Sequence, residues 1–582
     1  MKKILKRLFY YLKPYRLYFV LSILLSVFQV IGTLFIPVLI GKAVDCAVGK
    51  NNVDFSRLTQ IVVIMFIIIA VSFVFQWVAS ICINKFSVNS IKSLRCDVFS
   101  HIQKLPIKYI DNTPKGEVIQ TTINDVEIVS DGLLQGFNQF ISGALTIIGT
   151  LIFMITINYK IAIVVVILTP LSFFVSSKIT KMSRDSFVEQ SKLRGQMNSV
   201  AEEMIGNQEI IKGFNYEKES IRRFEEYNIK MKKVGAKATF CSSLTNPSTR
   251  FVNSIIYAAV GVLGSIAALG GVSFLGVLTI GQITSFLTYA NQYTKPFNEI
   301  SGVLSELQNA VASAERIFNL LDEKEESDDS KLEKIENPVG EMQAENVSFS
   351  YLPTQKLITA FNLNVGQNQK IAIVGPTGCG KTTIINLILR FYDVNEGRII
   401  VSGKNINEVQ RDSLRKCFGM VLQESWLFTG TIAENIAYSR PDASRDEIVE
   451  AAKSAFADDF IRRLPNGYDT VIQGNGSNLS QGQRQLLCIA RIMLVNPTFL
   501  ILDEATSSID LRTEQKIQLA FSKLMSGKTS FIIAHRLSTI VNSDKILVMN
   551  KGEIVEQGTH EELLKLNGFY THLYKSQFEN VM

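Results

Sequence analysis

The chain has 582 residues, of which 47% are hydrophobic and 19% charged, and its formal net charge is +7. Soluble globular chains average about 25% charged residues, so this composition excludes intrinsic disorder and an enzyme that is soluble throughout. At roughly 100–200 residues per domain, the length predicts more than one domain. The small positive charge is more typical of a membrane protein with basic cytoplasmic loops than of a nucleic-acid-binding protein, so we expect no nucleic-acid partner.

The cysteines indicate the compartment. There are seven, they are widely spaced, and no CxxC occurs. This pattern favours a reduced intracellular setting over a disulfide framework or a zinc cluster. We also expect no signal peptide, because the first apolar run is too long and lacks a small-residue cleavage site.

Long uncharged runs organise the first 300 residues. A helix needs about 20 residues to cross the hydrocarbon core of a bilayer, so the last run predicts two spans that break near Gly270 and Gly271. The chain is therefore predicted to have six transmembrane helices. The uncharged runs are 17–41, 58–84, 132–159, 161–177 and 251–294.

Charges between these runs predict the topology. The segment before the first run is basic and contains no acidic residue, which places the N-terminus in the cytoplasm. The long charged stretches 85–131 and 178–250 then lie in the cytoplasm too, and the outer connections are short. We expect both stretches to continue the membrane helices, with a turn at each tip, one of them at 111–116. The location predicted is the cytoplasmic membrane of a bacterium.

The composition changes after the sixth predicted span. We assign 1–322 to an all-α six-helix transmembrane domain with long cytoplasmic helical extensions, and 323–339, a charged polar stretch, to a linker. From 340 to 582 short apolar strands alternate with helical patterns, which predicts an α/β domain. The clearest predicted strands are 370–374 and 499–502.

The first of these strands leads into a GxxxxGK[ST] loop, the P-loop pattern in its required strand–loop–helix context. Glycines let backbone N–H groups surround phosphate oxygens, and the following helix N-terminus adds partial positive charge. Lys381 is expected to reach the β- and γ-phosphates of ATP, and the Thr382 hydroxyl to bind Mg²⁺. The loop residues are Gly375, Pro376, Thr377, Gly378, Cys379, Gly380, Lys381, Thr382 and Thr383.

The second strand, 499–502, ends in Asp503 and Glu504. Two carboxylates at the end of a buried strand are costly unless they have a task. Asp503 suits the coordination shell of Mg²⁺. Glu504 suits a general base that orients or deprotonates the attacking water.

Between these motifs lies Leu-Ser-Gln-Gly-Gln at 479–483, and we expect a helix to begin just after it, near Arg484. With the P-loop and the strand-end carboxylates, this sequence resembles the signature of the ABC transporter family. The resemblance covers the whole chain, with six membrane helices and then one nucleotide-binding domain in a single polypeptide. That order is similar to the exporter class, which moves its substrate by alternating access driven by ATP.

The resemblance implies further roles in nucleotide binding. Tyr351 would stack on adenine, and Gln423 would contact Mg²⁺ and water. Asp510 would be the D-loop aspartate, and His535 would contact the γ-phosphate. The contact with the nucleotide domain would be transmitted through the tips near 110–116 and 207–215.

In this family two nucleotide domains pack head to tail, and each ATP lies between one P-loop and the partner's signature. The resemblance therefore implies that Ser480, Gly482 and Gln483 contact ATP bound to a second half-transporter. Gln481 replaces the usual glycine, and 473–476 lacks the glutamate of the family's usual loop. Both features resemble the catalytic-glutamate subunit of bacterial heterodimeric multidrug exporters. A homodimer that tolerates Gln481 is the alternative.

The substrate is open to several interpretations. No Asp or Glu lies in the uncharged runs, so no counter-ion for a cation is evident. Aromatic side chains there either face lipid and neighbouring helices or line a cavity for hydrophobic or amphipathic compounds. Drug efflux is favoured, with a lipid flippase or a peptide exporter as the alternative. An ATP-gated channel would not need Glu504, and six spans exclude a soluble DNA-associated ATPase. The side chains are Phe28, Gln29, Phe35, Phe73, Phe75, Gln76, Trp77 and Phe153.

Overall fold

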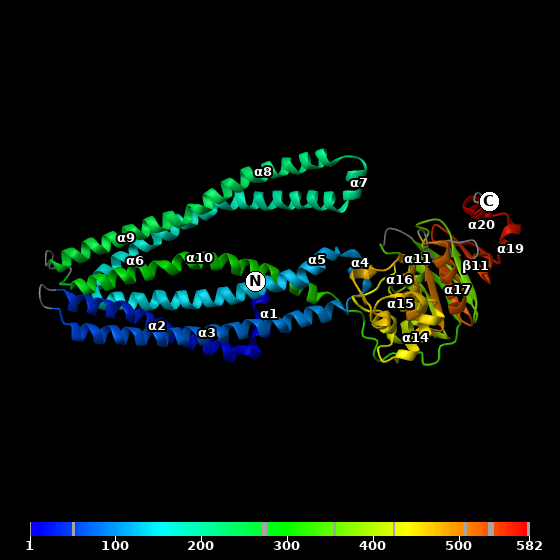
Figure 1. Cartoon of the computed structure of the whole chain (residues 1–582), viewed down its shortest axis with the longest axis horizontal. Helices are drawn as coiled ribbons and strands as arrows, with labels where there is room; N and C mark the ends of the chain where they lie inside the picture. The colour runs from blue at the N-terminus through cyan, green and yellow to red at the C-terminus, as the bar shows by residue number, and fades with distance from the viewer. Residues whose placement is uncertain are drawn as a thin grey trace. The chain divides into compact units, whose positions relative to one another are not determined.

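A computed structural model describes residues 2–48, 53–269, 276–352, 357–422, 425–503, 509–533 and 540–578. The chain forms two compact units. The membrane unit consists of Met1–Lys104 with Thr113–Lys324, and the nucleotide unit of Leu105–Asn112 with Glu325–Met582. The described part of the membrane unit is helical throughout, whereas the nucleotide unit contains sheets (Figure 1).

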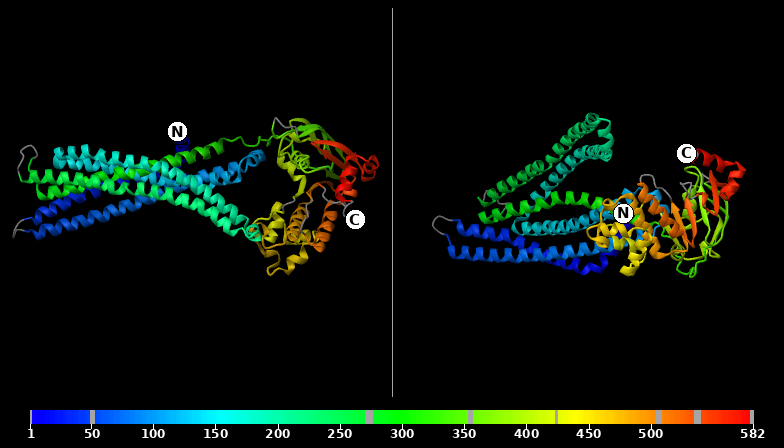
Figure 2. Two further views of the ribbon diagram at one scale, coloured as in Figure 1. Left: turned by 90° about the horizontal axis from the view of Figure 1, so that it is seen from above. Right: turned by 45° about the vertical axis from the view of Figure 1, so that its right-hand side comes forward.

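Long helices run side by side in the membrane unit (Figure 2). Along this unit, α10 packs on α6 and α2 packs on α3. A short helix, α7, lies at the tip of the hairpin formed by α6 and α8 (Figure 1). The helices are α1 (Lys2–Leu12), α2 (Arg16–Ala47), α3 (Phe55–Ile102), α5 (Lys115–Gln120), α6 (Val126–Gly206), α7 (Gln208–Gly213), α8 (Glu217–Ser243), α9 (Thr245–Ala268) and α10 (Ile280–Asp322).

Each of the six predicted spans is helical where described: α2, α3, the two arms of α6, α9 and α10. The arms of α6 meet at Asn158, whose backbone is not helical (φ −159°, ψ 106°). The predicted break at Gly270 and Gly271 lies outside the described residues. By length and composition alone, four described helical stretches could cross a membrane: Lys6–Ala47, Phe55–Ile102, Gln139–Leu171 and Glu217–Ala268.

A buried ion pair ties two helices of the membrane unit together. The Asp125 carboxylate is completely buried at the end of a π-helical turn, Thr121–Asp125. It accepts hydrogen bonds from Arg316 Nε at 2.7 Å and from Ser313 Oγ at 3.0 Å, both on α10. A buried carboxylate needs such donors because desolvation otherwise disfavours its charge. The pair therefore fixes the start of α6 against α10.

The nucleotide unit contains a six-stranded sheet in the order β12-β11-β3-β10-β9-β6 and a four-stranded sheet in the order β2-β1-β4-β5. In the larger sheet only β12 is antiparallel to its neighbour. The strands are β1 (Met342–Phe349), β2 (Ile358–Val365), β3 (Lys370–Val374), β4 (Glu396–Val401), β5 (Lys404–Asn405), β6 (Phe418–Val421), β7 (Gly430–Thr431), β8 (Val471–Ile472), β9 (Phe499–Asp503), β10 (Thr529–Ile533), β11 (Lys545–Asn550) and β12 (Glu553–Gly558).

Helices cover this sheet, because its central strands are apolar on both faces. On β9, Phe499 and Ile501 enter one hydrophobic core, and Leu500 and Leu502 enter the other. This alternation follows from the two-residue period of a strand. The helices are α4 (Ile107–Asn112), α11 (Lys381–Ile388), α12 (Arg411–Lys416), α13 (Ile432–Ile436), α14 (Arg445–Ser454), α15 (Asp458–Arg463), α16 (Gln481–Val495), α17 (Leu511–Met525), α19 (His560–Leu566) and α20 (Phe569–Phe578).

The predicted fold class is confirmed: a helical membrane domain precedes an α/β domain, and strands 370–374 and 499–502 are β3 and β9. One boundary was wrong. The helix expected to begin near Arg484 begins at Gln481, because Ser480 and Gln483 form a capping box at its N-terminus.

Candidate functional site

The P-loop connects β3 to α11 with its middle exposed to solvent. Gly378 (φ +81°) and Gly380 (φ +102°) have left-handed backbones that favour glycine. A Cβ at Gly375 would lie 2.3 Å from the carbonyl oxygen of Met549, so this glycine is required by close packing against β11. The loop can therefore turn its N–H groups toward an anion at the start of α11.

Lys381 lies over this loop. Its Nζ donates to the carbonyl oxygens of Gly375 at 2.9 Å and Pro376 at 3.0 Å. The Sγ of Cys379, 3.9 Å away, is buried within the loop. Thr382 is exposed, whereas the neighbouring Thr383 is buried. The ammonium group is thus held beside the exposed backbone, where a bound phosphate could replace the two carbonyl oxygens.

The parallel strands bring their carboxyl ends to one edge of the sheet. Asp503 on β9 pairs with Ile533 on β10, and Ile533 pairs with Ile373 on β3. Val421, the last residue of β6, pairs with Leu502. Ligands of open α/β sheets bind at this edge. The predicted residues Gln423, Glu504 and His535 lie outside the described residues.

The residues present fit a magnesium site. Mg²⁺ binds oxygen ligands and takes only one or two carboxylates from a protein, with substrate phosphates and waters completing its shell. Asp503, the last residue of β9, and the exposed Thr382, in the first turn of α11, each offer such an oxygen ligand. The described residues contain no cluster of three or more His, Cys, Asp or Glu side chains that could hold a metal by itself.

Tyr351 lies beside α11. Its hydroxyl is 3.4 Å from Thr383 Oγ1 and 3.4 Å from Asn386 Nδ2. Its ring packs edge-on against Phe349 and Tyr392, with centroids 4.9 Å away in both cases. The ring is still 38% exposed, so one face is available for a planar ligand next to the P-loop.

Ser480 of the signature and Asp510 of the predicted D-loop each lie at a helix N-terminus. Ser480 caps α16: its Oγ accepts from Gln483 N at 3.3 Å, and Gln483 Oε1 accepts from Ser480 N at 3.0 Å. Asp510 caps α17 by accepting from Thr513 N at 2.9 Å, and this backbone hydrogen bond lowers the pKa of the Asp510 carboxyl. A Cβ at Gly482 would lie 2.3 Å from Thr513 Cγ2, so α16 and α17 touch at this glycine.

A hydrogen bond joins α4 to the rest of this unit at the 110–116 tip, where the resemblance implies a contact with the nucleotide domain. The Tyr392 hydroxyl donates to Asp111 Oδ2 at 2.6 Å, and Ile107, on the same helix face, packs against the hydrophobic core. Burial raises the pKa of Tyr392, and the hydrogen bond to Asp111 raises it further. The resemblance indicated this tip as a point of contact, but neither it nor the turn predicted at 111–116 identified Tyr392 as the partner.

Both halves of the chain match known families. The model of the ABC transporter transmembrane region matches residues 19–297, and the model of the ABC transporter matches residues 358–507. The first segment extends from α2 into α10. The second contains the strands that hold the P-loop and Asp503.

Similar proteins cover nearly the whole chain. A fatty acid ABC transporter ATP-binding/permease protein of Mycobacterium bovis is 40% identical, covering 91% of this chain and 83% of its own length. A putative multidrug export ATP-binding/permease protein of Bacillus subtilis is 34% identical over 99% of both chains. A solved structure of a bacterial Atm1-family ABC exporter with ATP bound has a TM-score of 0.77 at 28% identity, covering 97% of this chain and 98% of that chain.

Proposed function

The chain belongs to the ABC transporter family as an ATP-hydrolysing exporter half-transporter, and from this premise we propose that it exports hydrophobic or amphipathic compounds across the cytoplasmic membrane. The observation that carries the proposal is the presence of a helical membrane unit and a P-loop unit on one chain. ATP must bind the closed arrangement of two nucleotide units more tightly than the open one, because equal affinity would shift no equilibrium. Closure would open the membrane helices outward, and hydrolysis would reset them.

For hydrolysis we propose the following roles. Backbone N–H groups of the P-loop and Lys381 bind the β- and γ-phosphates, and Tyr351 stacks on adenine. Glu504 accepts a proton from the water that attacks the γ-phosphorus, while the bond to the β–γ bridging oxygen breaks. His535 contacts the γ-phosphate. Mg²⁺, when bound by Thr382, Asp503 and Gln423, would neutralise charge on the phosphate oxygens.

A half-transporter works as a dimer, and we favour a heterodimer. Ser480 is exposed at the positive end of α16, which suits contact with ATP on a partner. Gly482 has no room for a side chain, but Gln481 is only half-buried on the first turn of α16. The fold therefore accommodates Gln481, and its side chain would act on the partner's nucleotide. The homodimer remains the alternative.

The substrate class rests on the membrane helices. Phe28, Phe73 and Trp77 are more than half exposed on α2 and α3, which suits contact with lipid or with an apolar substrate. Phe153 instead packs between Phe35 and Tyr289, so it holds helices together. One relative is a fatty acid ABC transporter and the other a putative multidrug exporter, so a lipid substrate is the second candidate.

Uptake into inside-out membrane vesicles tests the proposal. ATP should drive accumulation of a fluorescent amphipathic dye in vesicles that contain the chain and its partner half-transporter. Vesicles carrying Glu504→Gln are the matched control and should not accumulate it. ATP hydrolysis without accumulation of dyes, fluorescent lipids or hydrophobic peptides would contradict an export function of this class.

A further inference from the structure

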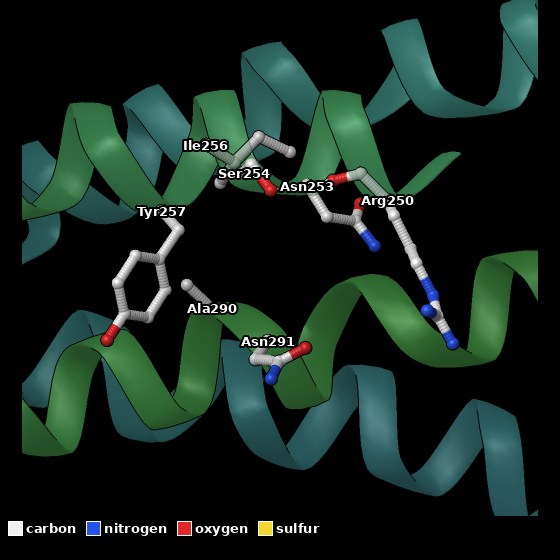
Figure 3. Close-up of a pocket in the computed structure, with 7 residues that line it drawn as sticks. All are labelled: Arg250, Asn253, Ser254, Ile256, Tyr257, Ala290 and Asn291. Carbon is white, nitrogen blue, oxygen red and sulfur yellow. Dashed lines mark hydrogen bonds between the residues drawn. The ribbon is translucent and has the colours of Figure 1, made fainter. Parts of the chain in front are cut away.

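A polar pocket lies between α9 and α10 inside the membrane unit. Its volume is about 340 Å³, at the low end of the roughly 300–1,000 Å³ typical of small-molecule sites. Arg250, Asn253 and Tyr257 extend from α9 toward α10, and Asn291 lies opposite them on α10 (Figure 3). The pocket is thus lined by side chains that carry hydrogen-bond donors.

The charge of this lining has one sign. Arg250 is its only charged residue, and no charged residue occurs from 251 to 294, where Lys295 follows on α10. Within the described residues, the Arg250 guanidinium makes no ion pair and no hydrogen bond. A guanidinium group beside apolar helices is best satisfied by an anion, which it can bind through two parallel hydrogen bonds.

The side chain of Asn253 is a second, independent observation that favours a bound molecule in this pocket. Its Oδ1 is buried and has no hydrogen-bond partner. Its amide nitrogen points toward the space between the two helices (Figure 3). Buried polar groups are normally paired, so the unpaired oxygen indicates an ordered water or a hydrogen-bond donor of a ligand. An anion in the pocket would instead accept a hydrogen bond from the Asn253 amide nitrogen.

The surroundings of the pocket are apolar. Ile256 and Ala290 complete its lining, and Phe251 and Ile255 expose their side chains on α9 beside it. The volume accommodates a small head group and the first part of one acyl chain, and the exposed apolar side chains would contact the rest of that chain. A two-chain lipid needs more room than this pocket offers.

We infer that this pocket binds the anionic head group of a single-chain amphiphile, such as the carboxylate of a fatty acid, through Arg250. The inference rests on the proposed export of amphipathic compounds and names their charge. A contact between Arg250 and the phosphate of a bilayer lipid is the competing interpretation, because arginines near the end of a span reach toward head groups.

Direct binding tests this without nucleotide or transport. Tritiated oleate is bound to the purified full-length chain in neutral detergent and displaced by unlabelled oleate, oleyl alcohol or phosphatidylglycerol. Oleyl alcohol should displace about tenfold less well than oleate, the factor expected when a charge-assisted hydrogen bond is missing. Arg250→Gln should weaken oleate binding about tenfold and leave oleyl alcohol unaffected, whereas Arg250→Lys should retain most of the affinity.

Lys237→Gln is the matched control, since it removes an exposed positive charge from α8 outside the pocket and should change nothing. Equal oleate affinity in wild type and Arg250→Gln would overturn the inference. Stronger displacement by phosphatidylglycerol than by oleate would also overturn it, in favour of a lipid contact. Selective oleate binding without ATP-driven uptake would contradict the proposed export function but not this inference. ATP-driven uptake without preference for the charged compound would contradict this inference but not the export function.

Discussion

Cys379 shows how closely the P-loop is packed. Its side chain is 3% exposed, and its Sγ would lie 2.7 Å from a Cβ placed at Gly375. Any group attached to this sulfur must displace the loop or the ammonium group of Lys381. The same few atoms therefore control both access to the thiol and binding of phosphate.

We expect N-ethylmaleimide to inhibit ATP hydrolysis slowly, with ATP protecting, because alkylated Cys379 cannot fit within the closed loop. Cys379→Ala should hydrolyse ATP and resist the reagent. Cys96→Ala is the control, since Cys96 is exposed on α3 of the membrane unit and is not part of the P-loop, so this variant should stay sensitive. Unchanged inhibition of Cys379→Ala would show that another site reacts.

Loss of the buried Asp125 carboxylate should destabilise the membrane unit. Asp125→Ala removes one partner of a buried pair, which costs about 3–5 kcal/mol; because Arg316 is half exposed we expect the lower end. The measurement is the midpoint of thermal unfolding in detergent. Glu226→Ala, which breaks an exposed pair with Arg222 on α8, should cost less than about 1 kcal/mol. Equal midpoints for the two variants would contradict the account.

Among the structural elements, those indicated by a local sequence pattern were predicted best. Strand β9 was found from its uninterrupted apolar run, and the P-loop from glycines whose backbone angles require them. The start of α16 was predicted too late, near Arg484. Ser480 and Gln483 were interpreted only as residues that contact nucleotide, although their spacing is also that of a capping box. The contact of Asp111 with Tyr392 joins residues 281 positions apart, and nothing in either neighbourhood indicates the other.

That contact predicts how α4 couples to the nucleotide unit. Tyr392→Phe removes the hydrogen bond to Asp111 while keeping the ring that supports Tyr351. We expect ATP affinity to stay within about twofold and dye uptake per ATP hydrolysed to fall several-fold, as for the loss of one hydrogen bond of about 1 kcal/mol.

Tyr570→Phe is the matched control for this variant. It removes a buried hydroxyl that contacts His560 at 2.7 Å between α20 and α19, remote in the fold from α4. Uptake per ATP should be unchanged in this variant. A similar fall in both variants would mean that stability, and not coupling through α4, is being measured.

At the scale of the whole molecule, one chain supplies one P-loop and one signature. A pair of half-transporters packed head to tail would therefore have two composite sites, and in the proposed heterodimer the two sites would differ. This chain would supply both the P-loop and Glu504 of the site that hydrolyses ATP efficiently. Its Gln481 would face the weaker site, whose P-loop belongs to the partner.

Restoring glycine tests this assignment. In the assembled heterodimer, Gln481→Gly should raise hydrolysis at the site whose P-loop belongs to the partner, and it should leave the Glu504-dependent site unaffected. Nucleotide trapped at each site after vanadate treatment distinguishes the two. A loss of activity at the Glu504-dependent site would contradict this assignment, because the signature of this chain would then contribute to that site.

We propose that Glu504 drives ATP hydrolysis at a site that a second half-transporter completes, and the ATPase rate of the purified chain tests this assignment. The chain is assayed alone and with its partner half-transporter, beside Glu504→Gln. We predict little activity alone, full turnover with the partner, and a loss of about 10²–10⁴-fold in Glu504→Gln, the typical contribution of a general base. High activity of the chain alone, lost in the variant, would indicate a homodimer. Undiminished turnover by Glu504→Gln would contradict the account.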